Sequence, residues 1–576
     1  MRYLISEHGE KPFLFAPVNR AAGLVNLRIF ADGQVVDEQS LRIGEPAEML
    51  AAFSLEAFRG QRIEAEFFDD DKTEEHPELS ALLFTGDRET EEAPLDNTRR
   101  PLIHYTCKKG FLNDPNGLLY YDGWYHMFYQ YNPYGVTHGN TCWGHARSRD
   151  CLHWEELAPA IWADREDGCI FSGSGVVDYD NTSGLKDGEA APILLFYTAT
   201  GYRFPPRRYF DHNFDAFFLE HSSTPFTKQG IACSTDGGRS FRKYENNPVL
   251  TQRAVLNRDP KVVWVPSLKA WVMLLFLQDH TYQFFYSENL LDWEDGERIS
   301  LEDCGECPDL FSLPLGPDST VNRADVMEKE KKWILWGAPG NYKIGHFEGR
   351  HFEPETGLIR GWCMENGKYA SGGAFAGYAP QTFYGLPGGR VLQLYWITEG
   401  FEGAGFASCM SLPVELSLVS GPAGPRLRFQ PCEETKSLRR AQRSFHGITT
   451  EGLLTEGAAG EAFELELRAA MGARGRIVLS VRGILLIYDR EDGRFICPSG
   501  NYEIGRHKDV LELRIWADRG VMELYTADGS FHTMIAAEAG KRARDAAVME
   551  CRDASLSGNL WELASIWERS PSPEIV

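Results

Sequence analysis

The chain has 576 residues, which is too long for one hydrophobic core and predicts two or three domains. Hydrophobic residues make up 43% of it and charged residues 25%, which is typical of a folded globular protein rather than a disordered one. The 83 Asp and Glu against 59 Lys and Arg give a net charge of -24, which repels phosphate backbones, so we expect no nucleic-acid partner. No apolar run approaches the roughly 18–20 residues that span a bilayer, so we expect no membrane partner.

The start of the chain and its cysteines bear on where the protein works. Residues 1–10 contain no apolar stretch of the kind that forms a secretory signal. The 12 cysteines are scattered, which favours reduced thiols over a disulfide framework. We therefore predict a cytoplasmic protein, while a secreted mature form with its signal removed stays open.

Residues 1–97 read as a small β-rich accessory domain. The segments 24–30 and 62–68 alternate between apolar and polar residues, as half-buried antiparallel strands do. The charged segment 69–76 is typical of a solvated loop, and 87–94 of a linker. Nothing in this domain suggests chemistry.

Residues 98–405 are predicted to form a β-propeller. The segment consists of short aromatic and β-branched runs separated by Gly, Pro, Asn and Asp turns. The sequence Ser-Arg-Asp-Cys-Leu-His-Trp at 148–154 is echoed by Ser-Glu-Asn-Leu-Leu-Asp-Trp at 287–293, and more loosely at 234–241. Such repeats fit propeller blades, and loops from several blades converge on a central channel.

Residues 406–576 are predicted to form a β-sandwich, which makes the whole chain all-β. Strict alternation over 462–467, 476–481, 511–516 and 521–525, with a turn at 527–529, is the pattern of short antiparallel strands. The segment 540–550 is the one place where we expect a helix.

The stretch 111–133 contains the first candidate site. Asn113-Asp114-Pro115-Asn116-Gly117 reads as a polar turn, and Asp122-Gly123 between apolar runs predicts a hairpin. Asp114 lies between two asparagines, where a carboxylate could bind a hydroxyl-rich ligand. A purely structural turn is the alternative, and the stretch alone leaves both open.

Two further acidic residues stand in unusual settings. Asp259 precedes a proline in Asn-Arg-Asp-Pro at 257–260, which favours an extended backbone. Glu306 stands among small and apolar residues in Cys-Gly-Glu-Cys-Pro-Asp at 304–309. Each motif alone is more typical of a structural turn. Cys304 and Cys307 have the spacing of a metal-binding pair, but no second pair stands at zinc spacing, so we expect no metal.

In combination and in this order, the three motifs resemble glycoside hydrolase family 32, the β-fructofuranosidases, which include invertases, inulinases and levanases. The resemblance runs from about residue 101 to the C-terminus and leaves residues 1–97 outside. Supporting segments lie at 128–133, 143–146, 171–174, 378–383, 518–519 and 521–525.

The resemblance implies a five-bladed propeller followed by a sandwich. It also implies retaining hydrolysis that releases terminal β-D-fructofuranosyl units from fructans or fructo-oligosaccharides, with sucrose possible. By this resemblance Asp114 is the nucleophile, Glu306 the acid/base, and Asp259 accepts hydrogen bonds from ring hydroxyls. Because Glu306 would stand beside two ionised carboxylates, we predict a raised pKa for it. No metal or other cofactor is expected.

The resemblance also implies a set of residues around the sugar. Amide, hydroxyl and guanidinium groups bind sugar hydroxyls, and aromatic faces pack on the C–H surface. The predicted substrate-binding residues are Asn113, Gln130, His138, Phe171, Ser172, Arg258, Tyr378 and Trp396. For Phe171, Tyr378 and Trp396 a place in the propeller core is the alternative.

Three positions depart from the family pattern. His138 and Gly305 stand where the family usually has tryptophan, and Ala376 where it has aspartate. We therefore expect fructosyl recognition and the three carboxylates to persist, while the leaving-group side is remodelled.

Three other interpretations remain. The same covalent intermediate would serve a fructosyltransferase, in which a sugar replaces water. The chain could also be a non-catalytic fructan-binding propeller. The aromatic segment 201–228 is typical of a lid or an interface, and through it or through the N-terminal domain the chain could form a homo-oligomer.

Overall fold

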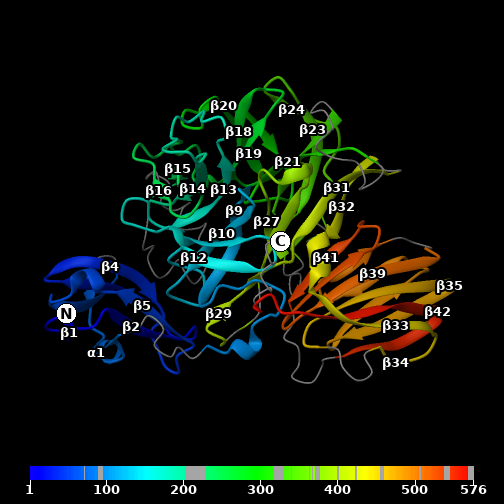
Figure 1. Ribbon diagram of the computed structural model, residues 1–576, viewed down its shortest axis with the longest axis horizontal. Coiled ribbons are helices and arrows are strands. Elements are labelled where there is room, and N and C mark those ends of the chain that lie inside the picture. Colours follow the sequence, from blue (N-terminus) through cyan, green and yellow to red (C-terminus); the bar gives the residue numbers. More distant parts are fainter. Residues whose placement is uncertain are drawn as a thin grey trace, which may run out of the picture.

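The computed structural model describes residues 1–69, 72–87, 95–201, 227–316, 330–338, 340–361, 364–365, 368–369, 377–398, 401, 403–421, 424–454, 460–504, 508–536 and 545–568. Within these residues the chain is built almost entirely of strands, which confirms the predicted all-β class. Figure 1 shows a large central body with a small N-terminal part on one side and a C-terminal part on the other. Among the described helices, none has both the length and the apolar character that crossing a membrane requires.

The central body is a ring of five sheets, counted over the described residues, and each contains four antiparallel strands that we call a blade. Blade 1 is β9 (Gly110–Tyr121), β10 (Trp124–Asn132), β11 (Cys142–Ser148) and β12 (Trp154–Ile161); blade 2 is β13 (Ile170–Val177), β14 (Ile193–Ala199), β15 (Lys228–Ser234) and β16 (Arg242–Lys243); blade 3 is β17 (Arg258–Val265), β18 (Ala270–Gln278), β19 (Thr281–Ser287) and β20 (Glu294–Ser300). Blade 4 is β21 (Asp309–Pro314), β22 (Lys331–Gly337), β23 (Asn341–Glu348) and β24 (His351–Pro354), and blade 5 is β27 (Gly377–Thr382), β28 (Leu392–Ile397), β31 (Val414–Gly421) and β32 (Gly424–Pro431). The first strands of successive blades are neighbours, and β27 contacts β9, which closes the predicted propeller.

The repeat seen in the sequence is a structural unit of the first three blades. Each copy forms the turn between the third and fourth strands of its blade. In each copy the serine hydroxyl donates a hydrogen bond to the Asp or Asn two residues later, and this side-chain contact holds the turn. The bonds are Ser148 to Asp150 at 2.9 Å, Ser234 to Asp236 at 2.7 Å and Ser287 to Asn289 at 3.2 Å.

The stretch 111–133 folds as a hairpin, with one correction. Asp122 and Gly123 have φ of 48° and 77° and join β9 to β10, as the Asp-Gly pair predicts. The polar turn predicted at 113–117 is wrong, because these residues lie inside β9. Two register shifts between β9 and β10 accommodate them. Such bulges redirect side chains, which here places Asp114 at the centre of the ring.

A buried ion pair fills the channel between blades 3, 4 and 5. Lys261 Nζ lies 2.7 Å from Asp309 Oδ1, and the two side chains are 5% and 0% exposed. Lys261 also donates to the Thr382 carbonyl at 3.1 Å, and Asp309 accepts the Thr382 backbone N–H at 2.8 Å. The two charged groups are therefore paired with each other and hydrogen-bonded to Thr382. These contacts join the first strands of blades 3, 4 and 5 and close the channel next to the carboxylates.

The N-terminal part has its own hydrophobic core under two small sheets, counted over the described residues. One sheet contains β1 (Arg2–Ser6), β6 (Ile63–Asp69), β3 (Val25–Ala31), β4 (Gln34–Leu41) and β7 (Lys72–Glu74), and the other β5 (Met49–Ser54), β2 (Phe13–Val18) and β8 (Phe84–Gly86). A single turn of helix, α1 (Pro77–Ser80), follows β7. This confirms the predicted β-rich character of the segment.

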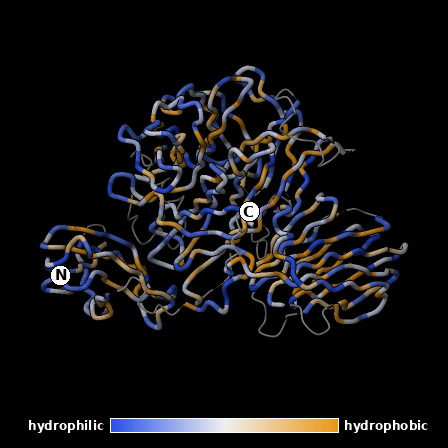
Figure 2. Tube along the Cα trace, in the orientation of Figure 1, coloured by the Kyte–Doolittle hydropathy of each residue, from blue (hydrophilic) through white to orange (hydrophobic). Residues whose placement is uncertain are grey.

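The C-terminal part forms the predicted layered β structure around a second large core. Its strands are β33 (Arg439–Ile448), β34 (Gly452–Leu453), β35 (Phe463–Val481), β36 (Ile484–Asp489), β37 (Arg494–Cys497), β38 (Gly500–Glu503), β39 (Val510–Ala517), β40 (Val521–Thr526), β41 (His532–Ala536) and β42 (Ala546–Leu563). Figure 2 shows hydrophobic and hydrophilic positions interleaved here, as half-buried strands require. The helix predicted over 540–550 is wrong where the structure describes it, since 546–550 belong to β42, which pairs with β35.

A buried histidine joins the propeller to the C-terminal part. His104 contacts Asp518 Oδ2 through Nδ1 at 2.9 Å and Glu523 Oε1 through Nε2 at 3.1 Å, and all three side chains are 0% exposed. Burial opposes its charge, but the two carboxylates outweigh burial and raise the pKa of His104 to about 9. The two parts therefore share a charged contact in their common core.

The channel ion pair generates a stability prediction. Lys261→Met leaves Asp309 buried without its counter-ion, which costs about 3–5 kcal/mol, and we expect a clear fall in the thermal unfolding midpoint by calorimetry. Lys436→Met is the matched control, because the bond from Lys436 to Glu433 is exposed and worth about 0–1 kcal/mol. Equal midpoints for the two variants would contradict a structural role of the channel pair.

Candidate active site

One small pocket lies where the first strands of the five blades meet. It is lined by Asp114, Pro115 and Asn116 from β9; Ser172 and Gly173 from β13; Asp259 and Pro260 from β17; Cys307 and Pro308 before β21; and Ala379, Pro380 and Gln381 from β27. Each blade thus contributes residues from its first strand or from just before it. The fold brings together Asp114, Asp259 and Glu306, of which the first and last are 192 residues apart in the sequence.

Asp114 is held in a network of polar side chains from blades 1 and 2. Its Oδ2 accepts hydrogen bonds from Ser172 Oγ at 2.6 Å and from Gln130 Nε2 at 3.4 Å. Asn113 Nδ2 donates to Gln130 Oε1 at 2.8 Å, while Asn113 Oδ1 is buried with no hydrogen-bond partner among the described residues. The network orients the carboxylate and leaves a buried acceptor beside it, which suits a ligand hydroxyl.

Asp259 adopts a strained backbone at the floor of the pocket. Its φ is 63°, so the extended geometry predicted from the following proline is wrong. Cys307 and Ala379 also precede prolines and also have positive φ, of 51° and 45°. Left-handed backbone at such residues costs about 1–3 kcal/mol each and clusters at functional sites. Here a neighbouring bond holds it, since the Cys307 N–H donates to Asp259 Oδ2 at 2.9 Å.

Glu306 lies at the more open side and is paired with an arginine. Its side chain is 33% exposed, against 6% for Asp259. Arg258 donates to Glu306 Oε2 through Nε at 3.0 Å and through a terminal nitrogen at 2.8 Å. The Tyr378 hydroxyl donates to Glu306 Oε1 at 2.9 Å. Both carboxylate oxygens are thus engaged from blades 3 and 5.

The three carboxylates differ in how well their charge is compensated. Burial raises the pKa of Asp114 to about 6, and the Glu306 charge adds to the shift. Burial likewise raises the pKa of Asp259 to about 7, although Arg258 acts against it. For Glu306, the charge and hydrogen bonds of Arg258 outweigh burial and lower the pKa. The raised pKa predicted for Glu306 is therefore wrong in this arrangement, because the sequence did not show that Arg258 pairs with Glu306.

Known proteins share both the sequence and this architecture. The model of the Glycosyl hydrolases family 32 N-terminal domain matches residues 104–431, more than half of the chain. The chain belongs to glycoside hydrolase family 32. The levanase of Bacillus subtilis (strain 168) is 30% identical over 501 residues, which cover 78% of this chain and 68% of the levanase.

Two further relatives support the family assignment. The invertase of Schizosaccharomyces pombe is 36% identical over 297 residues, which cover 48% of this chain and 46% of the invertase. The crystal structure of exo-inulinase from Aspergillus awamori matches with a TM-score of 0.67, covers 82% of this chain and 100% of its own, and is 24% identical. The second likeness shows the shared fold.

The predicted aromatic residues of this family 32 chain form one continuous wall beside the pocket, together with Phe111, which was not predicted as a site residue. Ring centroids are 6.4 Å apart for Phe171 and His138, 6.3 Å for His138 and Phe111, 6.1 Å for Phe111 and Trp396, and 6.3 Å for Trp396 and Tyr378. All four contacts are edge-to-face, which is a favourable geometry. Phe171 is only 8% exposed and packs in the propeller core, whereas His138 is exposed. For Phe171, the alternative of a place in the propeller core is therefore partly correct.

Of the two remaining family departures, Gly305 lies in the described part of the chain. Apart from its two chain neighbours, no described atom lies within 4 Å of the position that a Cβ at Gly305 would take, so the missing tryptophan leaves room. The Gly305 carbonyl accepts a hydrogen bond from the Tyr282 hydroxyl, which holds the segment in place. Ala376 and residues 202–226 lie outside the described residues.

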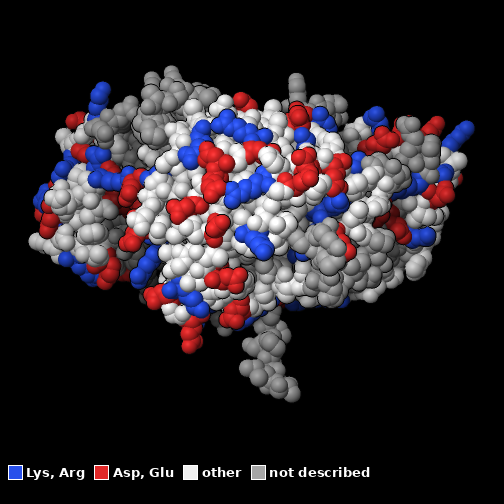
Figure 3. Space-filling model, turned by 90° about the horizontal axis from the view of Figure 1, so that it is seen from above, with Lys and Arg blue, Asp and Glu red and all other residues white. Residues whose placement is uncertain are grey.

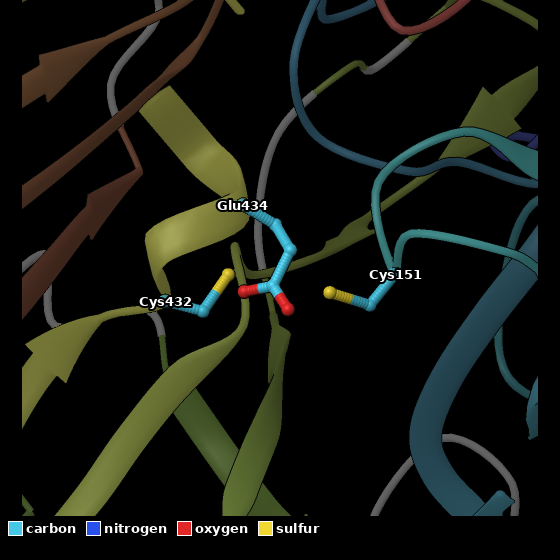
Figure 4. Close-up of side chains that lie close together, drawn as sticks. All are labelled: Cys151, Cys432 and Glu434. Carbon is cyan, nitrogen blue, oxygen red and sulfur yellow. The ribbon is translucent and has the colours of Figure 1, made fainter. Parts of the chain in front are cut away.

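A separate group of potential metal ligands lies away from the pocket. Cys151, Cys432 and Glu434 have ligand atoms within 4.8 Å of one another, and Figure 4 shows them converging from blade 1 and the segment after blade 5. Arg390 already binds both oxygens of Glu434, at 2.6 and 3.0 Å. The bonds to Arg390 explain the cluster as a polar contact between blade 1 and the segment after blade 5, where the ring closes. Cys304 and Cys307 do not converge, because the Cys304 thiol contacts the Gly337 and Asn341 carbonyls.

Two site residues were missed by sequence reasoning. The Cys307 thiol lies 3.5 Å from Asp114 Oδ2 and 3.6 Å from Asp259 Oδ2, so it separates the two carboxylates. Thr198 Oγ1 accepts the Asp259 backbone N–H at 3.0 Å. The place of Cys307 beside Glu306 was a usable signal. Thr198 offered none, because it lies in the middle of an ordinary strand.

The raised pKa values predict an unusual dependence of stability on pH. Asp114 and Asp259 hold their protons more tightly in the folded chain than at the ordinary value of 3.8, so the stability they contribute falls as pH rises from 3.8 to about 7. The Asp259→Asn variant cannot ionise at this position, so it no longer loses the part of the folding stability that depends on the Asp259 proton. We expect the variant to exceed the wild type by roughly 2–4 kcal/mol at pH 8 and to match it near pH 4, followed by thermal unfolding.

Asp150→Asn is the control of opposite sign. Burial opposes ionisation of Asp150, but hydrogen bonds from His153 and Leu152 hold its pKa at about 2. This variant should therefore be less stable than the wild type at pH 8. An Asp259→Asn variant that is equally destabilised at every pH would show that the Asp259 carboxylate is not under electrostatic stress.

Proposed function

We propose a double-displacement reaction for this family 32 glycoside hydrolase, which is of the β-fructofuranosidase type. The observation that carries the proposal is a buried Asp114 that lines the pocket and is held by donors, with Glu306 at the open side, directly before the lining residue Cys307 and near enough for its charge to act on Asp114. A retaining glycosidase needs such a nucleophile and such an acid/base. The relatives named levanase, invertase and exo-inulinase support fructans or sucrose as the substrate class.

In the first displacement the Asp114 carboxylate attacks the anomeric carbon of the terminal fructosyl unit. The bond from that carbon to the leaving oxygen breaks, and the leaving oxygen takes the proton of Glu306. Ser172 and Gln130 orient the attacking carboxylate through their hydrogen bonds to Asp114. The products of this step are a fructosyl ester of Asp114 and the departing sugar.

In the second displacement water replaces the departing sugar. The Glu306 carboxylate removes a proton from water, whose oxygen attacks the same carbon, and the ester bond to Asp114 breaks. Glu306 recovers its proton and Asp114 its charge. Two inversions at one carbon give net retention.

The distribution of protons in the pocket requires a shift on substrate binding. Burial raises the pKa of Asp259 to about 7, whereas pairing with Arg258 lowers that of Glu306, so before substrate binds a proton in the pocket favours Asp259 over Glu306. Sugar hydroxyls that donate to Asp259 replace this proton. Glu306 then receives it and becomes the acid that the first displacement needs.

Two alternative functions predict different products. A fructosyltransferase would pass the fructosyl unit from Asp114 to a second sugar, giving longer oligosaccharides at high sucrose. A non-catalytic binding propeller would bind fructan without releasing fructose. Figure 3 shows Lys and Arg interspersed with Asp and Glu over one face of the molecule, and the net charge of -24 disfavours polyanions as ligands. A homo-oligomer through the N-terminal domain is a further proposal, to be tested by size-exclusion chromatography with light scattering.

Catalytic variants test the reaction directly. We expect Asp114→Asn and Glu306→Gln each to lower kcat by at least about a thousandfold on a panel of sucrose, inulin and levan, because each removes a reacting group. Wild type should release fructose whose first anomer, seen by NMR, is the β form. Wild-type rates in either variant would overturn the assigned roles.

The space at Gly305 tests the remodelled leaving-group side. We expect Gly305→Trp to fold with an unchanged melting midpoint, since a Cβ there meets nothing within 4 Å among the described residues. The added ring should raise kcat/KM on sucrose relative to inulin about threefold or more by stacking on the leaving sugar. Gly305→Ala is the control and should leave the ratio unchanged. An unchanged ratio in the tryptophan variant would place the leaving sugar elsewhere.

A further inference from the structure

The loop between β10 and β11, residues 133–141, carries His138 above the pocket. Asn132 organises the start of this loop: its Nδ2 donates to the Thr137 carbonyl at 2.9 Å and its Oδ1 accepts the Tyr134 N–H at 3.0 Å. Asn132 is only 4% exposed, so these bonds are made in the interior. The loop is therefore a built structure with a defined shape.

The N-terminal domain holds this loop through a bidentate contact. Asn140 Oδ1 accepts the Ser40 backbone N–H at 2.9 Å, and Asn140 Nδ2 donates to the Ser40 carbonyl at 2.7 Å. Both residues are 6% exposed. The Asn140 amide thus pairs with β4 as a neighbouring strand would, at the cost of a left-handed φ of 44° that asparagine tolerates.

Apolar contacts hold the other end of the same loop. Val136 is 3% exposed and belongs to the hydrophobic core of the N-terminal domain. The Tyr134 ring stacks on Phe53 of β5, with centroids 5.1 Å apart and planes inclined by 8°. Buried packing and stacking of this kind are worth more than a rim contact. The loop is thus anchored at Tyr134, Val136 and Asn140, on both sides of His138.

His138 points from this anchored loop to the leaving-group side. Its ring lies edge-to-face against Phe111 and Phe171 and remains exposed. It stands near enough to Glu306 for the glutamate charge to act on it. One residue after Asn140, the Thr141 carbonyl accepts the Ile170 N–H at 2.8 Å, next to Phe171. The clamp on Asn140 therefore lies between two parts of the aromatic wall.

We propose that the N-terminal domain completes the leaving-group subsite, by clamping Asn140 to β4 and so placing His138 against the sugar unit that leaves with the Glu306 proton. The ligand class is the neutral hexose or oligosaccharide attached to the terminal fructosyl unit. Asn140 is a positioning residue, and His138 supplies its exposed ring as a contact surface for that sugar. The inference rests on the proposed function and assigns the N-terminal domain a part in it.

Two substrates separate the halves of the site. Methyl β-D-fructofuranoside has a leaving group too small to reach His138, whereas sucrose and the trisaccharide 1-kestose carry a sugar there. Asn140→Gly removes the clamp but keeps a residue that accepts φ of 44° without strain. We expect kcat/KM on sucrose and 1-kestose to fall about tenfold, mainly through KM, and that on the methyl fructoside to change less than twofold.

Matched variants identify the cause. His138→Ala should reproduce the selective loss, and the double variant should lose no more than the larger single effect. Arg165→Ala removes an ion pair to Glu38 on the same strand β4 without touching the loop, and should behave as wild type. Folding of each variant is checked by its thermal midpoint.

The outcomes are distinguishable. An Asn140→Gly variant that loses activity equally on all three substrates, or on none, overturns the proposed subsite. So does an Arg165→Ala variant with the same selective loss, because the effect would then belong to domain docking in general. A wild-type protein that releases no fructose from any of the three substrates overturns the proposed function instead.

Discussion

The structure depends on satisfying polar groups at the axis of the ring, where the buried first strands of five blades meet. The most deeply buried example is the ion pair of Lys261 and Asp309. It is stable only because Thr382 forms hydrogen bonds with both side chains. Similar cross-blade bonds run from Ser174 Oγ to the Pro260 carbonyl at 2.7 Å and from Gln381 Nε2 to the Gly173 carbonyl at 2.9 Å. These bonds join blade 2 to blades 3 and 5, and the ion pair joins blades 3, 4 and 5. They help to hold the pocket residues of these blades in place.

The negative charges of the three pocket carboxylates, near the same axis, are compensated less completely. Three carboxylates share one guanidinium, and Arg258 favours Glu306 over Asp259, whose oxygen it approaches only to 3.8 Å. The raised pKa values of Asp114 and Asp259 express that deficit. Added to it is the backbone strain at Asp259, Cys307 and Ala379. Under the proposed function, sugar hydroxyls that donate hydrogen bonds to these carboxylates relieve the deficit.

Sequence reasoning succeeded where local pattern and tertiary structure agree. The Asp122-Gly123 hairpin, the repeated serine turns and the alternating strands are all encoded within a few residues. Sequence reasoning failed where contacts between blades override the local backbone preference. Asp259 takes a left-handed φ before proline because a bulge in β17 and the Cys307 N–H hold it there. The pairing of Arg258 with Glu306 spans 48 residues and two blades, and nothing in either motif announces it.

The contrast between features set by local sequence and features set by distant contacts also separates the two proposed halves of the site. In the proposed assignment, Asp114, Ser172 and Asp259 of the fructosyl half lie in first strands, so the axis of the propeller places them. The leaving-group half is made from loops, and a loop keeps a defined shape only if something outside the blade holds it. For the loop of His138 that support comes from Ser40 and Phe53, in a domain whose sequence carries no sign of chemistry. In the proposed subsite, the N-terminal part has no reacting groups and acts by holding the loop that carries one wall of the pocket.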